Sequence, residues 1–290
     1  MPELPEVQTI VNELNEKVKE KIIEDAWTDK ENLIRNVSFT KFKKKITGKK
    51  IIEAKRRAKY IIIELSEGYV LLVHLKMTGH FLLGKWEIEN NKVKAIVEGP
   101  IKEDKYNDYI HIIFYLNTGE ELAFSDLRQF GRIELYTKEE FANLKEINNL
   151  GIEPLGEEFT LKRFENIVKS SKTNIKKLLM DQEKIAGIGN IYASEILFQA
   201  KVNPKRNTST LEDNEIKNIH NSIFAILNKA LELKGDSMSD YRRTGGEKGD
   251  YQNYAKVYEK KGQKCPDCEG IIEYAKINQR GTYYCPKCQK

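Results

Sequence analysis

The first hydrophobic pattern along the chain has the spacing of an α-helix. From Pro5 onward, the apolar residues Val7, Ile10, Val11 and Leu14 recur at intervals of three or four positions. One face of a helix has this spacing, and proline is favoured in a first helical turn. We therefore expect an amphipathic helix near the amino terminus.

Two later segments have the pattern of β-hairpins. Each consists of two runs rich in apolar, β-branched and aromatic residues, separated by a short turn that contains a glycine. The expected strands are residues 60–65 with 69–75, and residues 109–116 with 121–124. Residues 86–108 are polar and charged and predict no definite element. Residues 2–135 as a whole fit a β-sandwich with a flanking helix.

From residue 136 onward the pattern becomes helical. Helices are expected over residues 138–149, 161–170, 175–182, 191–199 and 211–233. The stretch at 151–156, which contains glycine and proline, fits a connection between domains. Strand-like pieces return at the end of the chain. The predicted fold class is α+β, with an N-terminal β-sandwich and flanking helices followed by a C-terminal helical domain and a β-hairpin.

Length and composition narrow the class of protein. A chain of 290 residues, of which 40% are hydrophobic, is long enough for two domains with buried cores. No stretch approaches the ~18 consecutive apolar residues of a membrane span. The amino terminus lacks the basic and apolar regions of a secretory signal. We expect a cytoplasmic protein with no membrane partner.

Positive charge is concentrated in one stretch. The formal net charge is +5, and ten of the nineteen residues from 41 to 59 are Lys or Arg, whereas only Glu53 is acidic. Such a run is typical of a solvated face. It indicates contact with a polyanion such as DNA only if other phosphate-binding signals accompany it.

All four cysteines lie near the carboxyl end of the chain, in two Cys-x2-Cys pairs. They are Cys265, Cys268, Cys285 and Cys288. This spacing suits tetrahedral thiolate coordination of Zn²⁺. The alternative of two disulfides is disfavoured in a reducing compartment. Since four thiolates leave no open coordination position, we expect one structural zinc ion and no catalytic metal.

A glycine-rich stretch lies between two of the expected helices. Gly187 and Gly189 permit a tight turn, and the helix that follows from Asn190 presents free backbone N–H groups at its positive end. A phosphate group suits such a helix start. An ordinary helix–helix turn with glycine caps fits the same residues.

The amino terminus carries a second chemical signal. Pro2 is small enough for Met1 to be removed, which leaves a free secondary amine. An α-amino group titrates near pKa ~7.7–8.0, so this amine can attack an electrophilic sugar carbon and form an iminium ion. Glu3 and Glu6 stand close by for acid–base steps. The alternative is a capped helix start with incidental glutamates.

Five motifs in order along the chain carry a family resemblance. They are PELPEV at 2–7, HLKMTG at 74–79, DLRQFG at 126–131, GIGNIY at 187–192 and QRGTYYCPKCQ at 279–289. With the four cysteines, this set resembles the formamidopyrimidine-DNA glycosylase family over the whole chain. The resemblance implies excision of oxidised purines from duplex DNA and cleavage of the abasic strand by β,δ-elimination.

The resemblance also implies a division of the chain. It consists of a catalytic β-sandwich domain (2–135), a connection with the first helix of the second domain (136–158), a helix–two-turns–helix domain (159–236), a lesion-capping loop (237–255) and a zinc finger (256–290). The capping loop matches the family only loosely. Its glycines and charges suggest a mobile lid.

The resemblance assigns catalytic roles to four residues. Pro2 is expected to be the nucleophile at C1′ of the damaged nucleotide, with Glu3 as its acid–base partner. Glu6 is expected to orient this site. Lys59 matches a lysine that contacts the phosphate and base of the lesion.

Six further residues match positions that contact DNA. His74, Asn190 and Arg280 are expected to grip phosphates. Met77, Arg128 and Phe130 are expected to enter the duplex when the lesion leaves it, because inserted side chains offset part of the unstacking cost. Structural alternatives exist, since a methionine, a phenylalanine or a lone histidine is often buried in a core.

Two positions depart from the family pattern. Ala58 takes the place of a frequent glycine before Lys59, a change expected to be harmless. Glu269 takes the place of the glycine that usually follows Cys268, so a slightly altered first zinc turn is expected.

Two other functions compete with this interpretation. An enzyme of the endonuclease VIII type shares the resemblance but prefers oxidised pyrimidines, and Leu4, Met77, Arg128 and Phe130 favour the purine-specific branch. A non-catalytic zinc-finger DNA-binding protein explains the cysteines and the basic residues but gives no reason for Pro2 beside Glu3. For the favoured interpretation, we expect a monomer whose partner is double-stranded DNA that contains oxidised bases.

Overall fold

The computed structural model describes residues 1–90, 92–238 and 240–290. Asn91 lies outside the described residues, and so does Ser239, which falls within the expected capping loop. The chain forms two compact units, and each is discontinuous in sequence. Unit 1 contains residues 1–148 and 233–252, and unit 2 contains residues 149–232 and 253–290. We call residues 233–252 the returning segment.

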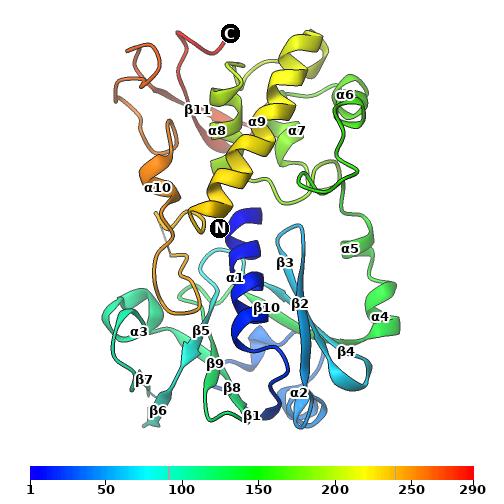
Figure 1. The fold of residues 1–290 in the computed structure, drawn as a ribbon, viewed down its shortest axis with the longest axis vertical. Coiled ribbons are helices and arrows are strands. Elements are labelled where there is room, and N and C mark those ends of the chain that lie inside the picture. The colour runs from blue at the N-terminus through cyan, green and yellow to red at the C-terminus, as the bar shows by residue number, and fades with distance from the viewer. Residues whose placement is uncertain (91, 239) are drawn as a thin grey trace. The chain divides into compact units, whose positions relative to one another are not determined.

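Unit 1 contains two four-stranded antiparallel sheets (Figure 1). The first has the order β1-β8-β9-β5, with the bounds Ile23–Thr28, Ile110–Leu116, Glu121–Ser125 and His80–Gly84. The second has the order β10-β4-β3-β2, with the bounds Arg132–Thr137, Tyr69–His74, Tyr60–Leu65 and Ile51–Arg57. Both predicted hairpins are confirmed, since β3 pairs with β4 and β8 pairs with β9.

The hydrophobic core of unit 1 takes side chains from both sheets. Ile61 and Val73 of one sheet and Phe81 and Phe124 of the other belong to the same buried cluster. The predicted amino-terminal helix is α1, Leu4–Lys17, and its Val7, Ile10, Val11 and Leu14 complete the cluster. A second helix, α2 (Phe39–Ile46), adds Phe42 and Ile46 to the core. The α+β fold class with an N-terminal sandwich is therefore confirmed.

Residues 86–108, for which the sequence predicted no element, form small irregular structures. They are β6 (Trp86–Glu89), β7 (Lys92–Ala95), α3 (Pro100–Glu103) and the 3₁₀ turn η3 (Lys105–Asn107). Trp86 and Ile101 pack with Leu82 and Ile113 in a separate small core. Tertiary packing, not local periodicity, fixes this part of the chain.

The helix expected at 138–149 is wrong as a single element. It is two short helices, α4 (Lys138–Ala142) and α5 (Lys145–Asn148). Asn143 separates the two helices. Its side-chain amide donates to the carbonyl oxygen of Glu139 at 2.9 Å and so competes with the backbone N–H groups that would continue the helix.

Unit 2 is mainly helical. Its helices are α6 (Leu161–Lys169), α7 (Ile175–Met180), α8 (Asn190–Gln199) and α9 (Asp213–Glu232), with the 3₁₀ turn η4 (Thr208–Thr210). The hairpin β11–β12 (Glu273–Ile277 and Arg280–Tyr284) follows near the carboxyl end. Thr160 and Asn174 cap α6 and α7 by accepting backbone N–H groups. Among the described helices, none is long and apolar enough to cross a membrane.

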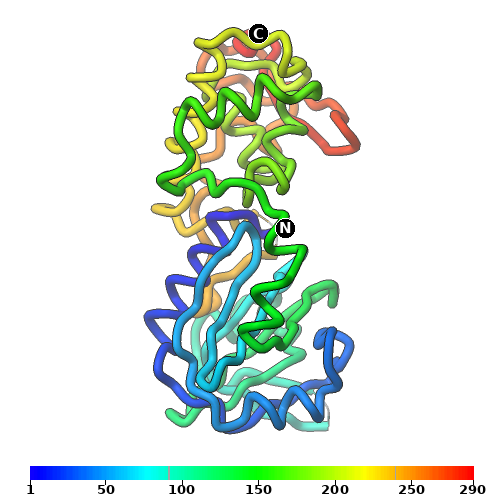
Figure 2. Tube along the Cα trace, turned by 90° about the vertical axis from the view of Figure 1, so that its right-hand side faces the viewer, coloured from blue at the N-terminus to red at the C-terminus, as the bar shows by residue number. Residues whose placement is uncertain are grey.

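The returning segment runs beside α1 and the first sheet, and Figures 1 and 2 show it in yellow and orange. Buried contacts fix it there. Arg243 donates to Oε1 of Glu13 at 2.6 Å, and Leu83 donates to the carbonyl oxygen of Thr244 at 2.7 Å. Arg242 is 1% exposed and donates to Oδ2 of Asp104 at 2.7 Å. These contacts hold residues 242–244 against unit 1, and the lid expected over residues 237–255 stays a prediction.

Candidate functional site

The amino-terminal residues that carry the predicted chemistry are buried in unit 1. Pro2 is buried, Glu3 is 3% exposed and Glu6 is 1% exposed, whereas Met1 is 41% exposed. Glu3 and Glu6 form a capping box at the start of α1, in which the backbone N–H of Glu3 donates to Oε2 of Glu6 at 2.7 Å. The capping box therefore fixes both glutamates at the helix start that follows Pro2.

The other oxygen of Glu6 is held by the returning segment. The backbone N–H of Asp236 donates to Oε1 of Glu6 at 2.8 Å. Gly235 has φ +84°, and a Cβ atom at this position would lie 2.7 Å from the same Oε1. Only glycine permits this approach, so the returning segment fixes Glu6 through its backbone.

Lys59 lies in the two-residue turn between β2 and β3, where Arg57 pairs with Tyr60. Ala58, the other turn residue, is buried and has φ +51°, a conformation that favours glycine. Glu269, which follows Cys268, also has a positive φ, of +56°. Both departures from the family glycine therefore occupy left-handed backbone positions, and the expectation that Ala58 is harmless stays a prediction.

His74 ends β4 and is held as a neutral ring. Its Nδ1 accepts a hydrogen bond from the backbone N–H of Lys76 at 3.0 Å. Burial, together with the positive charges of Lys76, Arg132 and Lys59, lowers the pKa of His74 to about 3. The proton of the neutral ring is therefore on Nε2, which can donate to a phosphate oxygen.

Arg128 and Phe130 are exposed on the turn between β9 and β10. The guanidinium of Arg128 lies 4.7 Å from the centre of the Phe130 ring, and Phe130 is 50% exposed. A core role for Phe130 is thereby excluded. Met77, on the turn after β4, is half-buried.

The turns that carry Met77 and Arg128 are joined by a buried pair. Thr78 donates its hydroxyl hydrogen to Oδ1 of Asp126, and its own oxygen accepts the backbone N–H of Arg128 at 3.0 Å. The backbone N–H of Gly131 donates to Oδ2 of Asp126 at 2.7 Å. Asp126 and Thr78 are 0% and 2% exposed. These bonds brace the backbone on both sides of Arg128 and Phe130 while leaving the two side chains exposed.

Asn190, in unit 2, begins α8 after the glycine-rich turn. Gln182 braces this turn, since its amide donates to the carbonyl oxygen of Ile188 at 2.7 Å and accepts the N–H of Gly187 at 2.8 Å. The ammonium group of Lys176 is buried and donates to Oδ1 of Asn190 at 2.7 Å. It also donates to Oγ1 of Thr282 at 2.7 Å.

Arg280 is exposed at the start of β12, next to Gly281. The side-chain amide of Asn190 donates to the carbonyl oxygen of Gly281 at 3.0 Å. The structure thus brings together two of the predicted phosphate-contacting residues, Asn190 and Arg280, through Lys176 and Gly281.

The four cysteines form the metal site predicted from their spacing. Their Sγ atoms all lie within 4.8 Å of one another. The distances are 3.8 Å from Cys265 to Cys288 and 3.4 Å from Cys268 to Cys285. Tetrahedral zinc with Zn–S bonds of ~2.3 Å separates its thiolates by about 3.8 Å, whereas a disulfide joins its sulfur atoms at ~2.05 Å. The donor set therefore fits Zn²⁺.

Several supporting residues, two in unit 1 and two in unit 2, were not predicted from the sequence. Thr78 and Asp126 lie inside two of the motifs, but no periodicity indicates that they pair. Lys176 is followed by Lys177, and two adjacent lysines are typical of the solvent-exposed face of a helix. Glu195 is fully buried on α8 and accepts three backbone N–H groups, from Lys256, Val257 and Tyr258, at 2.8–2.9 Å. Its place within an apolar helix is the only signal in the sequence.

Comparisons with known proteins agree with this architecture. Residues 1–133 match the formamidopyrimidine-DNA glycosylase N-terminal domain, residues 150–242 match the formamidopyrimidine-DNA glycosylase H2TH domain, and residues 262–290 match the zinc finger found in FPG and IleRS. A formamidopyrimidine-DNA glycosylase of Pelotomaculum thermopropionicum is 39% identical over 290 residues, which cover 100% of this chain and 99% of that protein.

Solved structures give the same result. The complex between the Lactococcus lactis FPG and a FAPY-dG containing DNA has a TM-score of 0.85 at 33% identity, covering 99% of this chain and 100% of that chain. The complex of Lactococcus lactis Fpg with an abasic site containing DNA has a TM-score of 0.86 at 33% identity, covering 99% of both chains.

The fold, the three matching family domains and the similar proteins define a DNA-repair glycosylase. The chain belongs to the formamidopyrimidine-DNA glycosylase family. Its four cysteines hold one structural zinc ion.

Proposed function

We propose that this enzyme excises oxidised purines, such as 8-oxoguanine and formamidopyrimidines, from duplex DNA and then cleaves the abasic strand. The observation that carries the proposal is the environment of Pro2. A buried proline follows an exposed Met1, and the buried carboxyl groups of Glu3 and Glu6 follow it within four positions of the chain. One of them, Glu6, is fixed by two backbone N–H groups. A binding protein has no need of this arrangement.

The proposed reaction begins after removal of Met1. The secondary amine of Pro2 attacks C1′ and gives its proton to Glu3, and the C1′–N bond to the damaged base breaks, so that the base leaves with the electron pair and takes a proton from water. Glu3 protonates O4′ as the sugar ring opens, and an iminium ion links Pro2 to the DNA. The positive charge of the iminium favours loss of a C2′ proton with elimination of the 3′ phosphate, and then loss of the C4′ proton with elimination of the 5′ phosphate. Water finally hydrolyses the iminium and releases Pro2.

The remaining predicted residues are proposed to hold the DNA. Lys59 contacts the phosphate and base of the lesion, and His74, Asn190 and Arg280 grip phosphates. A neutral imidazole with its proton on Nε2 suits this role for His74. The exposed Arg128–Phe130 pair and Met77 enter the space left by the displaced nucleotide. Residues 237–255 cap the displaced base.

The proposal includes the oligomeric state, the location and the substrate preference of the enzyme. The enzyme acts as a monomer in the cytoplasm, on the chromosome. The endonuclease VIII type is the second candidate for substrate preference, and the exposed Phe130 beside Arg128 favours the purine-specific alternative.

The experiment that tests the function uses a duplex with one 8-oxoguanine opposite cytosine, in parallel with a thymine glycol duplex. We expect excision and strand cleavage on the first duplex and much slower cleavage on the second. Borohydride added during the reaction reduces the iminium and traps a covalent complex, and peptide mapping should place the DNA on Pro2. A crosslink on a lysine such as Lys59 would contradict the assignment of the nucleophile.

Two variants serve as controls for the chemistry. One residue added ahead of Pro2 converts the amine to an amide, which abolishes both crosslinking and cleavage while lesion binding remains. Glu3→Gln should slow base excision more than it slows cleavage of a pre-formed abasic site. Intact mass shows whether Met1 has been removed. Binding of the lesion duplex without any excision would favour the non-catalytic alternative.

A further inference from the structure

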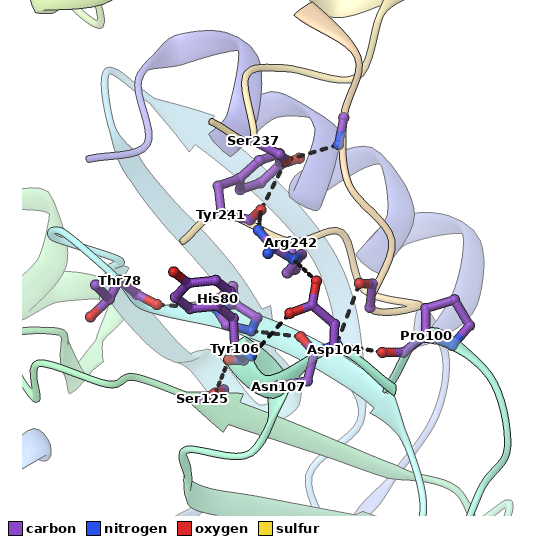
Figure 3. Close-up of polar contacts among 12 residues, drawn as sticks. Thr78, His80, Pro100, Asp104, Tyr106, Asn107, Ser125, Ser237, Tyr241 and Arg242 are labelled. Carbon is purple, nitrogen blue, oxygen red and sulfur yellow. Dashed lines mark hydrogen bonds and ion pairs between the residues drawn. The ribbon is translucent and has the colours of Figure 1, made fainter. Parts of the chain in front are cut away.

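A chain of buried hydrogen bonds connects the Thr78 turn with the returning segment (Figure 3). At its centre is His80, the first residue of β5, which is 1% exposed. Its Nδ1 lies 3.0 Å from the carbonyl oxygen of Thr78, and its Nε2 lies 3.2 Å from Oδ1 of Asn107. His80 and Asn107 have no part in the proposed chemistry.

Asn107 extends this chain to the returning segment. Its Nδ2 donates to the carbonyl oxygens of Pro100 at 2.8 Å and of Gly246 at 3.3 Å. Gly246 has φ +87°, and a Cβ atom there would lie 2.8 Å from Nδ2 of Asn107. The backbone of the returning segment therefore lies directly against this amide.

The other end of the chain reaches the turn that carries Arg128 and Phe130. Thr78 accepts the backbone N–H of Arg128 and donates to Asp126, as described above. A shift of the backbone at Thr78 therefore changes the hydrogen bonds to both Arg128 and His80.

The donors and acceptors around His80 do not balance for a neutral ring. The two carbonyl oxygens of Pro100 and Gly246 require the amide N–H groups of Asn107, so Oδ1 of Asn107 faces His80. Both ring nitrogens of His80 then face oxygen acceptors, whereas a neutral imidazole has a single N–H. Only the imidazolium form satisfies both contacts. The neutral form must leave one contact weak or turn the Asn107 amide away from Gly246.

We propose that His80 and Asn107 are positioning residues which couple the turn carrying Arg128 and Phe130 to the returning segment, so that filling of the duplex and capping of the displaced base depend on each other. This inference rests on the proposed function. The coupling affects the rate of base excision, because the base must be displaced and held during that step. It does not matter on a substrate that already lacks the base.

The charges around His80 set the direction of its pH dependence. Burial lowers the pKa of His80, hydrogen bonds to Thr78 and Asn107 raise it, Arg242 lowers it and Asp126 raises it, with a net lowering. Arg242 is itself paired with Asp104. His80 is therefore neutral at neutral pH, and the fully bonded imidazolium form gains population as the pH falls.

Two substitutions separate the two contacts. The amide nitrogen of His80→Asn takes the place of Nδ1 and keeps the bond to Thr78 but loses the contact with Asn107. The amide nitrogen of His80→Gln takes the place of Nε2 and keeps a donor to Asn107, without a titrating group. The matched control is His111→Gln, because His111 is a buried histidine on β8 of the same sheet, paired with Asp29 outside this chain.

The measurement is the ratio of two single-turnover rates, excision of 8-oxoguanine and cleavage of a pre-formed abasic site. We expect His80→Asn to lower this ratio about fivefold or more, the factor that one lost buried hydrogen bond gives. His80→Gln, which has no donor for the carbonyl oxygen of Thr78, should also lower the ratio, whereas His111→Gln should stay near the wild-type ratio. The ratio of the wild type divided by that of His80→Gln should rise as the pH falls below the ordinary pKa of histidine, because the imidazolium form then gains population.

The outcomes separate the two proposals. Equal losses on both substrates in His80→Asn, or no loss in a folded His80→Asn, overturn the coupling. If His80→Asn does not fold by circular dichroism, the pH comparison of the wild type with His80→Gln decides, continued to the lowest pH at which both proteins stay folded, and a flat result over that whole range overturns the coupling. A wild-type protein that neither excises 8-oxoguanine nor forms the Pro2 crosslink overturns the proposed function itself.

Discussion

Oε1 of Glu6 accepts the backbone N–H of Asp236 at 2.8 Å, although 230 positions separate the two residues in the chain. The bond is possible because Gly235 has no Cβ, which would lie 2.7 Å from that oxygen. The geometry of the proposed active site thus depends on a glycine in the returning segment.

Gly235→Ala should displace Glu6 and the start of α1, and it should lower the rate of base excision by about tenfold or more, since small misplacements at a reacting centre can cost that much. Gly68→Ala is the matched control. Gly68 also has a positive φ (+78°), but no atom lies within 4 Å of a Cβ there. Both variants carry similar backbone strain, so equal activities at equal thermal stability would contradict a role for the Gly235 contact.

Phe130→Ala should slow excision of 8-oxoguanine and have a smaller effect on an abasic duplex, because a missing base costs less to displace. Leu127→Ala is the control, since Leu127 lies on the same turn and is 39% exposed. Phe130 is half-exposed, so the stability loss should stay well below the ~3–5 kcal/mol of a buried Phe→Ala change. Single-turnover rates and urea unfolding measure the two effects. Equal losses on both duplexes would indicate a purely structural role.

Removal of zinc, or Cys265→Ser, should abolish tight DNA binding and leave the unfolding of the β-sandwich unit unchanged. A two-stranded hairpin is marginal without a further constraint, and β11–β12 carries Arg280. The control is Asp267→Ser, in the same cysteine turn and paired with Lys201. Gel-shift titration with and without a chelator, together with circular dichroism, tests this. Full affinity of metal-free protein would refute it.

The lowered pKa of His74 predicts acid lability of unit 1. The unfolded chain binds a proton on this residue below about pH 6.5, whereas the folded protein does so only near its pKa of about 3. The stability contribution is therefore fully present above pH 6.5 and is lost as the pH falls toward 3, by about 1 kcal/mol per pH unit.

Urea unfolding at several pH values between about 7 and 4.5 measures this loss. His74→Gln should flatten the slope of unfolding free energy against pH. His80→Gln, which removes the other buried histidine with a lowered pKa, serves to separate the two contributions. A slope in His74→Gln equal to that of the wild type would show that His74 is not its source.

The sequence predicts those parts of the fold in which local pattern and tertiary structure agree. The hairpins β3–β4 and β8–β9 and the helix α1 follow directly from periodicity, and the zinc site follows from cysteine spacing. The structure of residues 86–108 depends on packing around Trp86 and Ile101, and no local sequence pattern predicts this packing. The burial of Lys176 and Arg242 likewise depends on partners more than a hundred positions away.

Residues 233–252 complete unit 1 only after all of residues 149–232 have been synthesised. At a ribosomal rate of about 5–20 residues per second, this gap lasts roughly 4 to 17 seconds. During that time Glu6, Glu13 and Asp104 wait without the partners that the returning segment supplies. The contacts that fix Glu6 therefore form only after the chain has been synthesised beyond residue 236, so the amino-terminal residues of this enzyme reach their final geometry late in translation of unit 1.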